Sequence, residues 1–438
     1  MIPTLQKIGL LTVLLLAAIN ASAYKFMSDG LCYNILSTED RTVEVTYKTS
    51  MNGHYNYNGY VEGILTIPAK VISGNRTYSV ISIGEHAFET CKSLTQVNIP
   101  YSVTNINQNA FYTTGLTAFN VADDNLHYAT IDGVLYNKDV TRLIACPWLM
   151  TQVTIPNSVT AIGDNAFYWC TSLTQVTIPN SVTSIGNSAF AHCSSLTQVT
   201  IPNSVTAIGD NVFNDCSSLT QVTIGNSVTA IGYGAFSGCS GLTQVTIPES
   251  VTVIGDNAFY DCSSLTQVTI PNSVTSIGNS AFAHCSSLTQ VTIGNSVTSI
   301  GDAFDYCYAL TTIYCFPATP PEAPINSFTS DVLKNAILYV PKGCKAAYEA
   351  VDPWRNFWNI QELDAAAGIK DATDGDNGLK IVVRDGNLTI EGAEASAAIE
   401  IYSASGQLLS RSFERSVSGL PKGIYLVRVG NQTSKIAL

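Results

Sequence analysis

The sequence is poor in charged side chains, and basic ones are the scarcest. Only 12% of the 438 residues are charged, with 21 Lys and Arg against 33 Asp and Glu, which gives a net charge of −12. Binding to nucleic acid or to anionic lipid depends on clustered Lys and Arg. We therefore expect no nucleic acid among the partners of this protein.

Long apolar runs are absent after the first few residues. The chain begins with Lys7, an apolar run over residues 8–19 and the small residues 21–23, which is the pattern of a secretory signal peptide over residues 1–23. No later segment reaches the roughly 20 apolar residues that a membrane span needs. We expect a secreted protein without a membrane span. The alternative is that the secreted protein stays attached to the outer cell surface.

Motifs that carry catalysis or bind metal are missing as well. The chain has five histidines, no C-x-x-C spacing, and no G-x-S-x-G, H-E-x-x-H or glycine-rich phosphate loop. His192 and His284 lie four repeats of 23 residues apart, so they are copies of one duplicated residue and are predicted to be solvated. We predict that the protein is not an enzyme and uses no metal or other cofactor.

What the sequence contains in abundance is a 23-residue repeat. The string SLTQVTIPNSVTSIGNSAFAHCS at residues 172–194 returns at residues 264–286. Leu173, Val176 and Ile178 have the L-x-x-L-x-L spacing of a short strand with its apolar side chains turned inward. One coil cannot bury these side chains alone, whereas stacked coils cover one another. The pattern predicts a solenoid with a parallel β-sheet and short helical or 3-10 turns.

The repeat unit also resembles a known family. The pattern L-x-x-[IV]-x-[IL]-P-x-S-V-x-x-I-G-x-x-A-F-x-x-C is similar to the BspA-like leucine-rich repeats of surface proteins from Bacteroidetes and some protozoa. We predict these repeats over residues 61–315, N-terminal cap strands over 24–60, and a C-terminal cap over 316–363. The cap resembles the one common in that family, and its Trp354, Phe357 and Trp358 are expected to cover the last coil.

At one place the spacing between successive repeats increases from 23 to 34 residues. The extra segment, near residues 125–139, has an Asp132-Gly133 turn between two alternating runs, which predicts a hairpin that projects from the stack. Its Tyr128 and Tyr136 are candidate exposed contact residues.

The composition changes again after the cap. Residues 364–378 have the small, polar composition of a linker, and the short alternating runs over residues 379–438 predict a small β-sandwich. This last segment is similar to the C-terminal sorting domain that directs cargo to the type IX secretion route of Bacteroidetes.

Cysteine recurs at one repeat position and is expected to form a column of small buried side chains beside phenylalanine. The structural candidates are Cys170, Cys193, Cys216, Cys239, Cys262, Cys285, Phe190 and Phe282. Disulfides between neighbouring coils, roughly 4.8 Å apart, are the alternative, and Cys315 with Cys344 is a further candidate pair. The aspartates after each Ile-Gly pair are predicted to be N-caps rather than calcium ligands; they are Asp164, Asp210, Asp256 and Asp302.

Glutamine and threonine fill the outward positions of the predicted strands. The candidate binding residues are Gln175, Thr177, Gln198, Thr200, Gln221, Thr223, Gln244, Thr246, Gln267 and Thr269. Solenoids commonly bind partners along such extended faces, and the BspA-like resemblance implies binding of host matrix proteins and contact between cells. We predict a recognition or adhesion module for a host matrix or surface protein or a glycan. The alternatives are a structural spacer of the cell envelope, and a polar face that only reflects recent duplication. The oligomeric state stays open.

Overall fold

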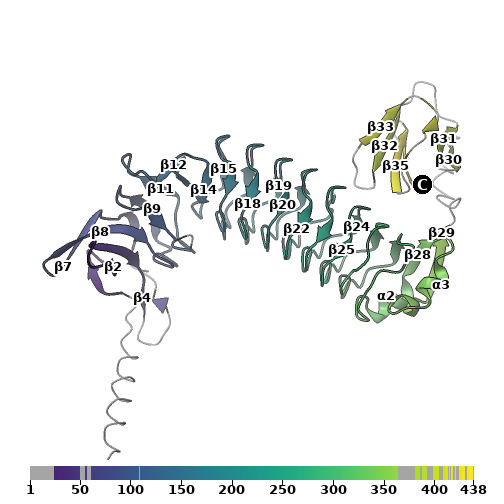
Figure 1. Cartoon of the computed structure of the whole chain (residues 1–438), viewed down its shortest axis with the longest axis horizontal. Helices are drawn as coiled ribbons and strands as arrows, with labels where there is room; N and C mark the ends of the chain where they lie inside the picture. The colour runs from purple at the N-terminus through teal and green to yellow at the C-terminus, as the bar shows by residue number, and fades with distance from the viewer. Residues whose placement is uncertain are drawn as a thin grey trace, which may run out of the picture. The chain divides into compact units, whose positions relative to one another are not determined.

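The fold is given by a computed structural model. It describes residues 24–49, 55–56, 61–107, 109–363, 380–384, 387–391, 398–403, 408–412, 414, 416–417, 420, 424–429 and 432–437. The predicted signal peptide over 1–23 and the predicted linker over 364–378 lie outside these residues. The chain forms two compact units, Met1–Met150 with Gly163–Cys170, and Thr151–Ile162 with Thr171–Leu438. Figure 1 labels the elements of both units.

The N-terminal unit begins with a mostly antiparallel sheet. Its strands are β1 (Phe26–Ser28), β2 (Leu31–Ser37), β3 (Thr42–Thr46), β7 (Lys70–Ser73), β8 (Arg76–Ile83) and β10 (Asn105–Ile106). A separate short pair is formed by β4 (Lys48–Thr49) and β5 (Tyr55–Asn56). Tyr33, Val43 and Val80 from this sheet are buried in the same core cluster as Phe88 of the first coil. The sheet thus supplies apolar cover for the start of the repeats.

The first coils follow in parallel. Their strands β6 (Gly63–Thr66), β9 (Leu94–Ile99) and β11 (Ala118–Val121) pair in the order β11-β9-β6. The predicted hairpin is present as β12 (Tyr128–Ile131) and β13 (Val134–Asn137), with Asp132 and Gly133 both at positive φ in its turn. Two consecutive residues at positive φ are what a type I′ turn requires. A third strand, β14 (Arg142–Ala145), pairs with β13.

The second unit repeats one coil many times. Strands pair in register, so that each glutamine, valine and threonine lies beside its own copy. The first strand row comprises β15 (Gln152–Thr154), β17 (Gln175–Thr177), β19 (Gln198–Thr200), β21 (Gln221–Thr223), β24 (Gln267–Ile270), β26 (Gln290–Ile293) and β27 (Thr312–Cys315). The second row comprises β16 (Ala161–Ile162), β18 (Ser184–Ile185), β20 (Ala207–Ile208), β22 (Ala230–Ile231), β23 (Val253–Ile254) and β25 (Ser276–Ile277). The predicted parallel solenoid is confirmed (Figure 1).

A ladder of phenylalanine rings runs through the core of these coils. Rings of successive coils stack with centroids 5.1–5.8 Å apart and planes within 4–9° of parallel. The ladder consists of Phe190, Phe213, Phe236, Phe259, Phe282, Phe304 and Phe328. Because every coil has a phenylalanine at the same repeat position, the ring of each coil is shielded from solvent by the rings of the neighbouring coils.

The segment that holds these rings is a series of turns, with no helix in the described coils. The aspartates expected to cap helices therefore have another role. Asp210 Oδ1 accepts from the backbone N–H of Tyr233 at 3.0 Å, and Asp256 Oδ1 accepts from Asn279 at 2.7 Å. Both donors lie 23 residues further on, so these carboxylates join neighbouring coils. The N-cap prediction was wrong because no helix begins at these positions.

The C-terminal cap contains the few regular helices of the described chain. They are α2 (Ser330–Asn335), α3 (Lys345–Tyr348) and the 3-10 turn η1 (Trp354–Asn356), and strands β28 (Ile337–Pro341) and β29 (Asn359–Leu363) extend the sheet after β27. Trp354 and Phe357 are buried against Phe328, as expected. Trp358 is 76% exposed and does not cover the coil. Neighbouring residues of extended backbone point to opposite sides, so burial of Phe357 turns Trp358 outward.

The C-terminal region is all β. One sheet has the order β30-β31-β34 and the other β33-β32-β35-β36. Their bounds are β30 (Lys380–Arg384), β31 (Asn387–Glu391), β32 (Ile399–Ser403), β33 (Leu408–Ser412), β34 (Ser416–Val417), β35 (Ile424–Val429) and β36 (Gln432–Ala437). Leu388 of the first sheet shares one buried cluster with Ile401 and Val427 of the second. Two sheets over a common core form a sandwich.

Candidate binding surfaces

The outward side chains of the first strand row form a strip, here called the Gln–Thr strip. It consists of Gln175, Thr177, Gln198, Thr200, Gln221, Thr223, Gln244, Thr246, Gln267 and Thr269. Strands β17, β19 and β21 each expose the glutamine and the threonine and bury the valine between them. The predicted outward orientation is therefore confirmed, with Thr269 half-buried. Gln244 and Thr246 are exposed, although their coil has no assigned strand there.

The side chains of the Gln–Thr strip make no hydrogen bond to any residue that the structure describes. Threonines at other repeat positions differ. The Thr229 hydroxyl donates to the Thr206 carbonyl of the preceding coil at 3.1 Å, and Thr252 donates to Thr229 at 3.1 Å. Those hydroxyls hold the coils together. The strip keeps its donors and acceptors available for an outside partner.

The corresponding positions of the N-terminal unit use their polar groups internally. The Asn98 amide donates to the Thr66 hydroxyl at 2.9 Å, and its Oδ1 accepts from Asn120 at 3.1 Å. The exposed part of the strip also ends at β26. There Thr292 is only 2% exposed and pairs in the sheet register with Tyr314. The available polar surface is thus limited to the coils between these positions.

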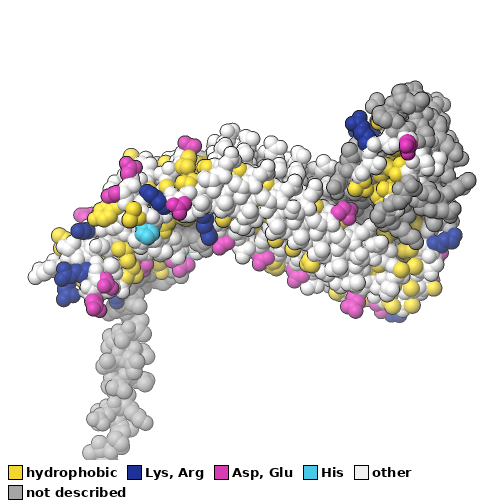
Figure 2. All heavy atoms as spheres, turned by 45° about the horizontal axis from the view of Figure 1, so that its top comes forward, with side chains coloured by type: hydrophobic (Ala, Val, Ile, Leu, Met, Phe, Trp, Pro, Cys, Tyr) yellow, Lys and Arg dark blue, Asp and Glu magenta, His cyan; other side chains and the backbone are white. Residues whose placement is uncertain are grey.

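The middle coils present an uncharged surface. Figure 2 shows a face on which white atoms, uncharged polar side chains and backbone, predominate over the middle of the repeats, with acidic side chains along one margin. A partner that binds such a surface is recognised by hydrogen bonds and shape rather than by charge.

The hairpin tyrosines are buried, and the prediction that they are exposed was wrong. Tyr136 is 1% exposed and Tyr128 is 9% exposed, and Tyr128 belongs to the core cluster of the N-terminal unit. The Tyr128 hydroxyl donates to the Thr104 carbonyl at 3.3 Å. The prediction of a projecting hairpin was wrong because β14 pairs with β13, and the three strands together pack onto the core.

The predicted column of cysteines is buried inside the coils. The twelve cysteines all lie in the described residues and form no disulfide there, and all except the half-buried Cys344 are buried. Thiols of the column donate to a phenylalanine carbonyl of the preceding coil at 3.1–3.3 Å, as Cys262 does to Phe236. Burial raises the pKa of Cys91 to about 12 and that of Cys315 to about 12. A thiol held in its neutral form is a poor nucleophile and a poor metal ligand.

The histidines are less solvated than predicted. His192 is half-buried, and its Nδ1 lies 3.3 Å from Asp215 Oδ2. Burial lowers its pKa, and the Asp215 carboxylate partly opposes this effect. His284 stacks on Tyr306 with centroids 4.4 Å apart. The left-handed turn at each position brings the ring back over the neighbouring coil, because both residues have φ near 60°.

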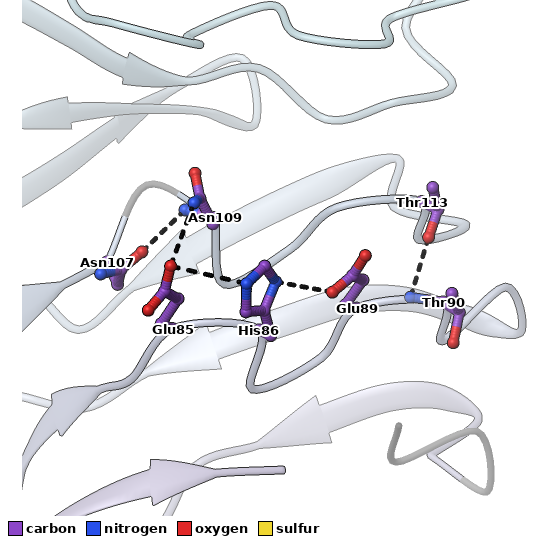
Figure 3. Close-up of polar contacts among 7 residues, drawn as sticks. All are labelled: Glu85, His86, Glu89, Thr90, Asn107, Asn109 and Thr113. Atoms are coloured by element: carbon purple, nitrogen blue, oxygen red, sulfur yellow. Dashed lines mark hydrogen bonds and ion pairs between the residues drawn. The ribbon is translucent and has the colours of Figure 1, made fainter. Parts of the chain in front are cut away.

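A polar cluster that the sequence did not reveal surrounds His86 (Figure 3). Its Nδ1 lies 2.6 Å from Glu89 Oε2, and its Nε2 lies 3.5 Å from Glu85 Oε1. The Asn109 amide also donates to Glu85 at 3.4 Å. Glu85 and Glu89 flank His86 in the sequence, and the turn brings both carboxylates onto its ring. The Glu-His spacing was the only available signal, and it does not encode this convergence.

Neither a membrane-spanning helix nor a metal centre is found in the described residues. None of the helices there is long and apolar enough to cross a bilayer. No three His, Cys, Asp or Glu side chains of this part of the chain converge as a metal ion would require.

Comparison with known proteins places the repeats in a family. Residues 70–134, 145–266 and 206–335 match the model of the BspA type leucine-rich repeat region, in six copies. No curated protein matches the chain.

Several solved structures are similar to this chain. A leucine-rich repeat protein from Bacteroides ovatus is 25% identical, with a TM-score of 0.45, over 78% of this chain and 100% of that one. A leucine-rich cell surface protein from Faecalibacterium prausnitzii is 26% identical, with a TM-score of 0.38, over 77% and 94%. A leucine-rich repeat protein from Eubacterium ventriosum is 21% identical, with a TM-score of 0.42, over 63% and 91%. Because the family model matches more than half of the residues, the chain belongs to the BspA type leucine-rich repeat family.

Proposed function

We propose that this protein is a secreted or surface-attached recognition module without catalytic activity, and that it binds a protein or glycan partner along the Gln–Thr strip. One observation carries the proposal. The side chains of the strip make no hydrogen bond to another described residue, whereas the hydroxyl of a threonine such as Thr229 is hydrogen-bonded to the preceding coil. Leucine-rich repeats commonly use an extended face for binding.

The rigidity of the strip also supports binding. Its strands β19 and β21 are held in register by backbone pairing, and the Phe213 and Phe236 rings of the same coils stack 5.3 Å apart. A partner therefore meets side chains already in place, which lowers the entropy cost of association. Many weak contacts along the face, rather than one pocket, would supply the affinity.

The test begins with a screen of the protein against immobilised matrix proteins and glycans. A four-site variant, Gln198→Ala, Thr200→Val, Gln221→Ala and Thr223→Val, should bind the identified partner at least about tenfold more weakly, since each lost hydrogen bond contributes about 0.5–1.5 kcal/mol. Its melting temperature should not change.

Two hydroxyl-removing substitutions provide the matched control. Thr229→Val and Thr252→Val delete hydroxyls that bond the preceding coil, so they should lower the melting temperature and leave the affinity unaltered. Absence of binding to every matrix protein and glycan would contradict the proposal.

The second candidate function is a spacer of the cell envelope, favoured by the near-identity of successive coils. Deletion of two whole coils separates the two functions. A spacer tolerates the deletion, whereas a module that reads an extended partner loses affinity stepwise as coils are removed.

A further inference from the structure

The last coils form a groove along the second strand row, here called the serine groove. It has a volume of about 590 Å³ and is lined by strands β23 and β25, by the turns that follow them and by the start of the C-terminal cap. All of its residues lie in the second unit. The side chains that line it are those of Val253, Asp256, Ser276, Asn279, Ser299 and Glu322.

The floor of the groove is bare backbone, because the coils approach each other too closely for a side chain there. A Cβ atom on Gly255 would lie 2.8 Å from the carbonyl carbon of Gly232, and one on Gly278 would lie 2.5 Å from that of Gly255. Only glycine fits at these positions. The Ile-Gly pair of each coil therefore leaves a channel between the second strand row and the turn that follows it.

One wall of the groove is a row of polar side chains. Ser276 pairs with Ser299, and Ser299 pairs with Glu322, by parallel backbone bridges. Residues paired in this way lie side by side on one face of a sheet. The two serines are half-buried and Glu322 is exposed, and none of the three side chains makes a hydrogen bond or ion pair with another described residue. Two hydroxyls and a carboxylate thus face the groove with their polar groups unused by the fold.

The opposite wall carries a second carboxylate, that of Asp256. Its Oδ1 accepts from the Asn279 N–H at 2.7 Å, which fixes the carboxylate at the wall. Its other oxygen makes no hydrogen bond to a described residue. Asp256 belongs to the coil of β23, whereas Glu322 belongs to the cap segment at the other end of the row. The two carboxylates therefore lie toward opposite ends of the groove.

No basic side chain of the coils balances this negative charge. Residues 143–333 contain ten Asp and Glu and not a single Lys or Arg, and Figure 2 shows acidic side chains along one margin of the repeats. Carboxylates without counter-charges create a negative potential that attracts cations. Two carboxylates at the ends of one channel, with hydroxyls between them, match a ligand that has two cationic groups and a polar middle.

The strand spacing sets the distance between those cationic groups. Three steps from strand to strand lead from the coil of Asp256 to Glu322, by way of Ser276 and Ser299. Parallel strands lie about 4.8 Å apart, so the carboxylates are separated by about 14 Å along the stack. An extended peptide rises about 3.3 Å per residue and turns every second side chain to the same side, which places residues i and i+4 about 13 Å apart on one face.

We propose that the serine groove binds an extended basic segment of a partner protein, with two lysines four residues apart paired with Asp256 and Glu322. The hydroxyls of Ser276 and Ser299 can donate and accept, which suits the N–H and C=O groups of the peptide between the lysines. The groove belongs to a different strand row from the Gln–Thr strip and selects its ligand by charge. The inference thus goes beyond the function proposed above.

The test measures binding of the full chain to two peptides of identical composition, one with Lys-x-x-x-Lys spacing and one with Lys-x-x-Lys spacing, in which x is Ser or Gly. The second peptide turns its lysines to opposite sides. We expect the first to bind at least about threefold more tightly, as one additional exposed ion pair provides. Its affinity should fall as the salt concentration rises. Equal affinity of the two peptides would overturn the assignment.

The repeat itself supplies variants that preserve the fold. Asp256→Asn keeps an acceptor for the next coil, since Asn187 Oδ1 accepts from the Asp210 N–H at 3.0 Å at the same repeat position. Asp256→Asn and Glu322→Gln should each weaken binding of the Lys-x-x-x-Lys peptide about threefold, and together about tenfold. Neither substitution should change the melting temperature.

Asp261→Asn is the matched control. It removes the same charge from the same coil at an exposed position outside the groove, so it should leave peptide binding unchanged. The four-site variant of the Gln–Thr strip should also keep its peptide binding, which distinguishes failure of one proposal from failure of the other. An equal loss with Asp261→Asn, undiminished binding by the double variant, or retention on the amino-sugar polymer chitosan without peptide binding would each contradict the assignment.

Discussion

The phenylalanine ladder offers a quantitative test of how the coils are held together. Phe236 is fully buried, with its ring 5.3 Å from Phe213 and 5.2 Å from Phe259, each within 9° of parallel. The substitution Phe236→Ala removes the ring and leaves both neighbours without a stacking partner on one side.

The expected loss is large. Truncation of a buried phenylalanine to alanine costs about 3–5 kcal/mol of unfolding free energy. Two aromatic pairs at about 0.5–1.5 kcal/mol each are broken together, which places Phe236→Ala near the upper end of that range. Phe236→Leu is the matched control, since it retains most of the volume and loses mainly the ring pairs. It should cost about 1–3 kcal/mol.

Urea unfolding followed by circular dichroism measures both variants. In a solenoid the stability is a sum of coil and interface contributions, so weakening two interfaces in the middle should also split the transition and lower the slope of free energy against urea. A loss below about 1 kcal/mol for Phe236→Ala, or equal losses for Ala and Leu, would refute the idea that ring stacking joins the coils.

Three further outcomes are expected. Native protein should expose one thiol to a maleimide, that of half-buried Cys344, and the eleven buried cysteines should react only after unfolding; rapid labelling of several thiols would disprove their burial. Burial lowers the pKa of His192 below 6.5 in the folded protein, so the histidine contributes its full share of stability above pH 6.5. As the pH falls from 6.5 toward the lower pKa of the folded protein, the unfolded chain takes up the proton first and the free energy of unfolding decreases. The variant His192→Asn should therefore lose less melting temperature than the parent between neutral pH and about pH 5, and an identical loss in both proteins would exclude this effect. Tyr136→Ala should destabilise the N-terminal unit by about 3–5 kcal/mol, because the ring is 1% exposed; a change below about 0.5 kcal/mol, typical of a surface site, would mean that the ring is not in the core.

The 23-residue period by itself determined the solenoid. One coil cannot bury its own inward apolar side chains, so successive coils must stack to bury them. Stacking of identical coils then places identical residues side by side. The outward position of Gln198 and Thr200 and the burial of the cysteine column follow from the same period, and so both were predictable from the sequence.

Only the tertiary structure decided the positions where the repeat is broken. The alternation around Tyr136 indicates a strand, but it does not encode that β14 covers that strand and buries the tyrosine. Likewise, no local pattern places the Trp148 ring parallel to that of Trp169, or the Asn109 amide on Glu85. Burial and convergence depend on contacts between segments far apart in the chain, whereas a sequence pattern specifies only the geometry of neighbours.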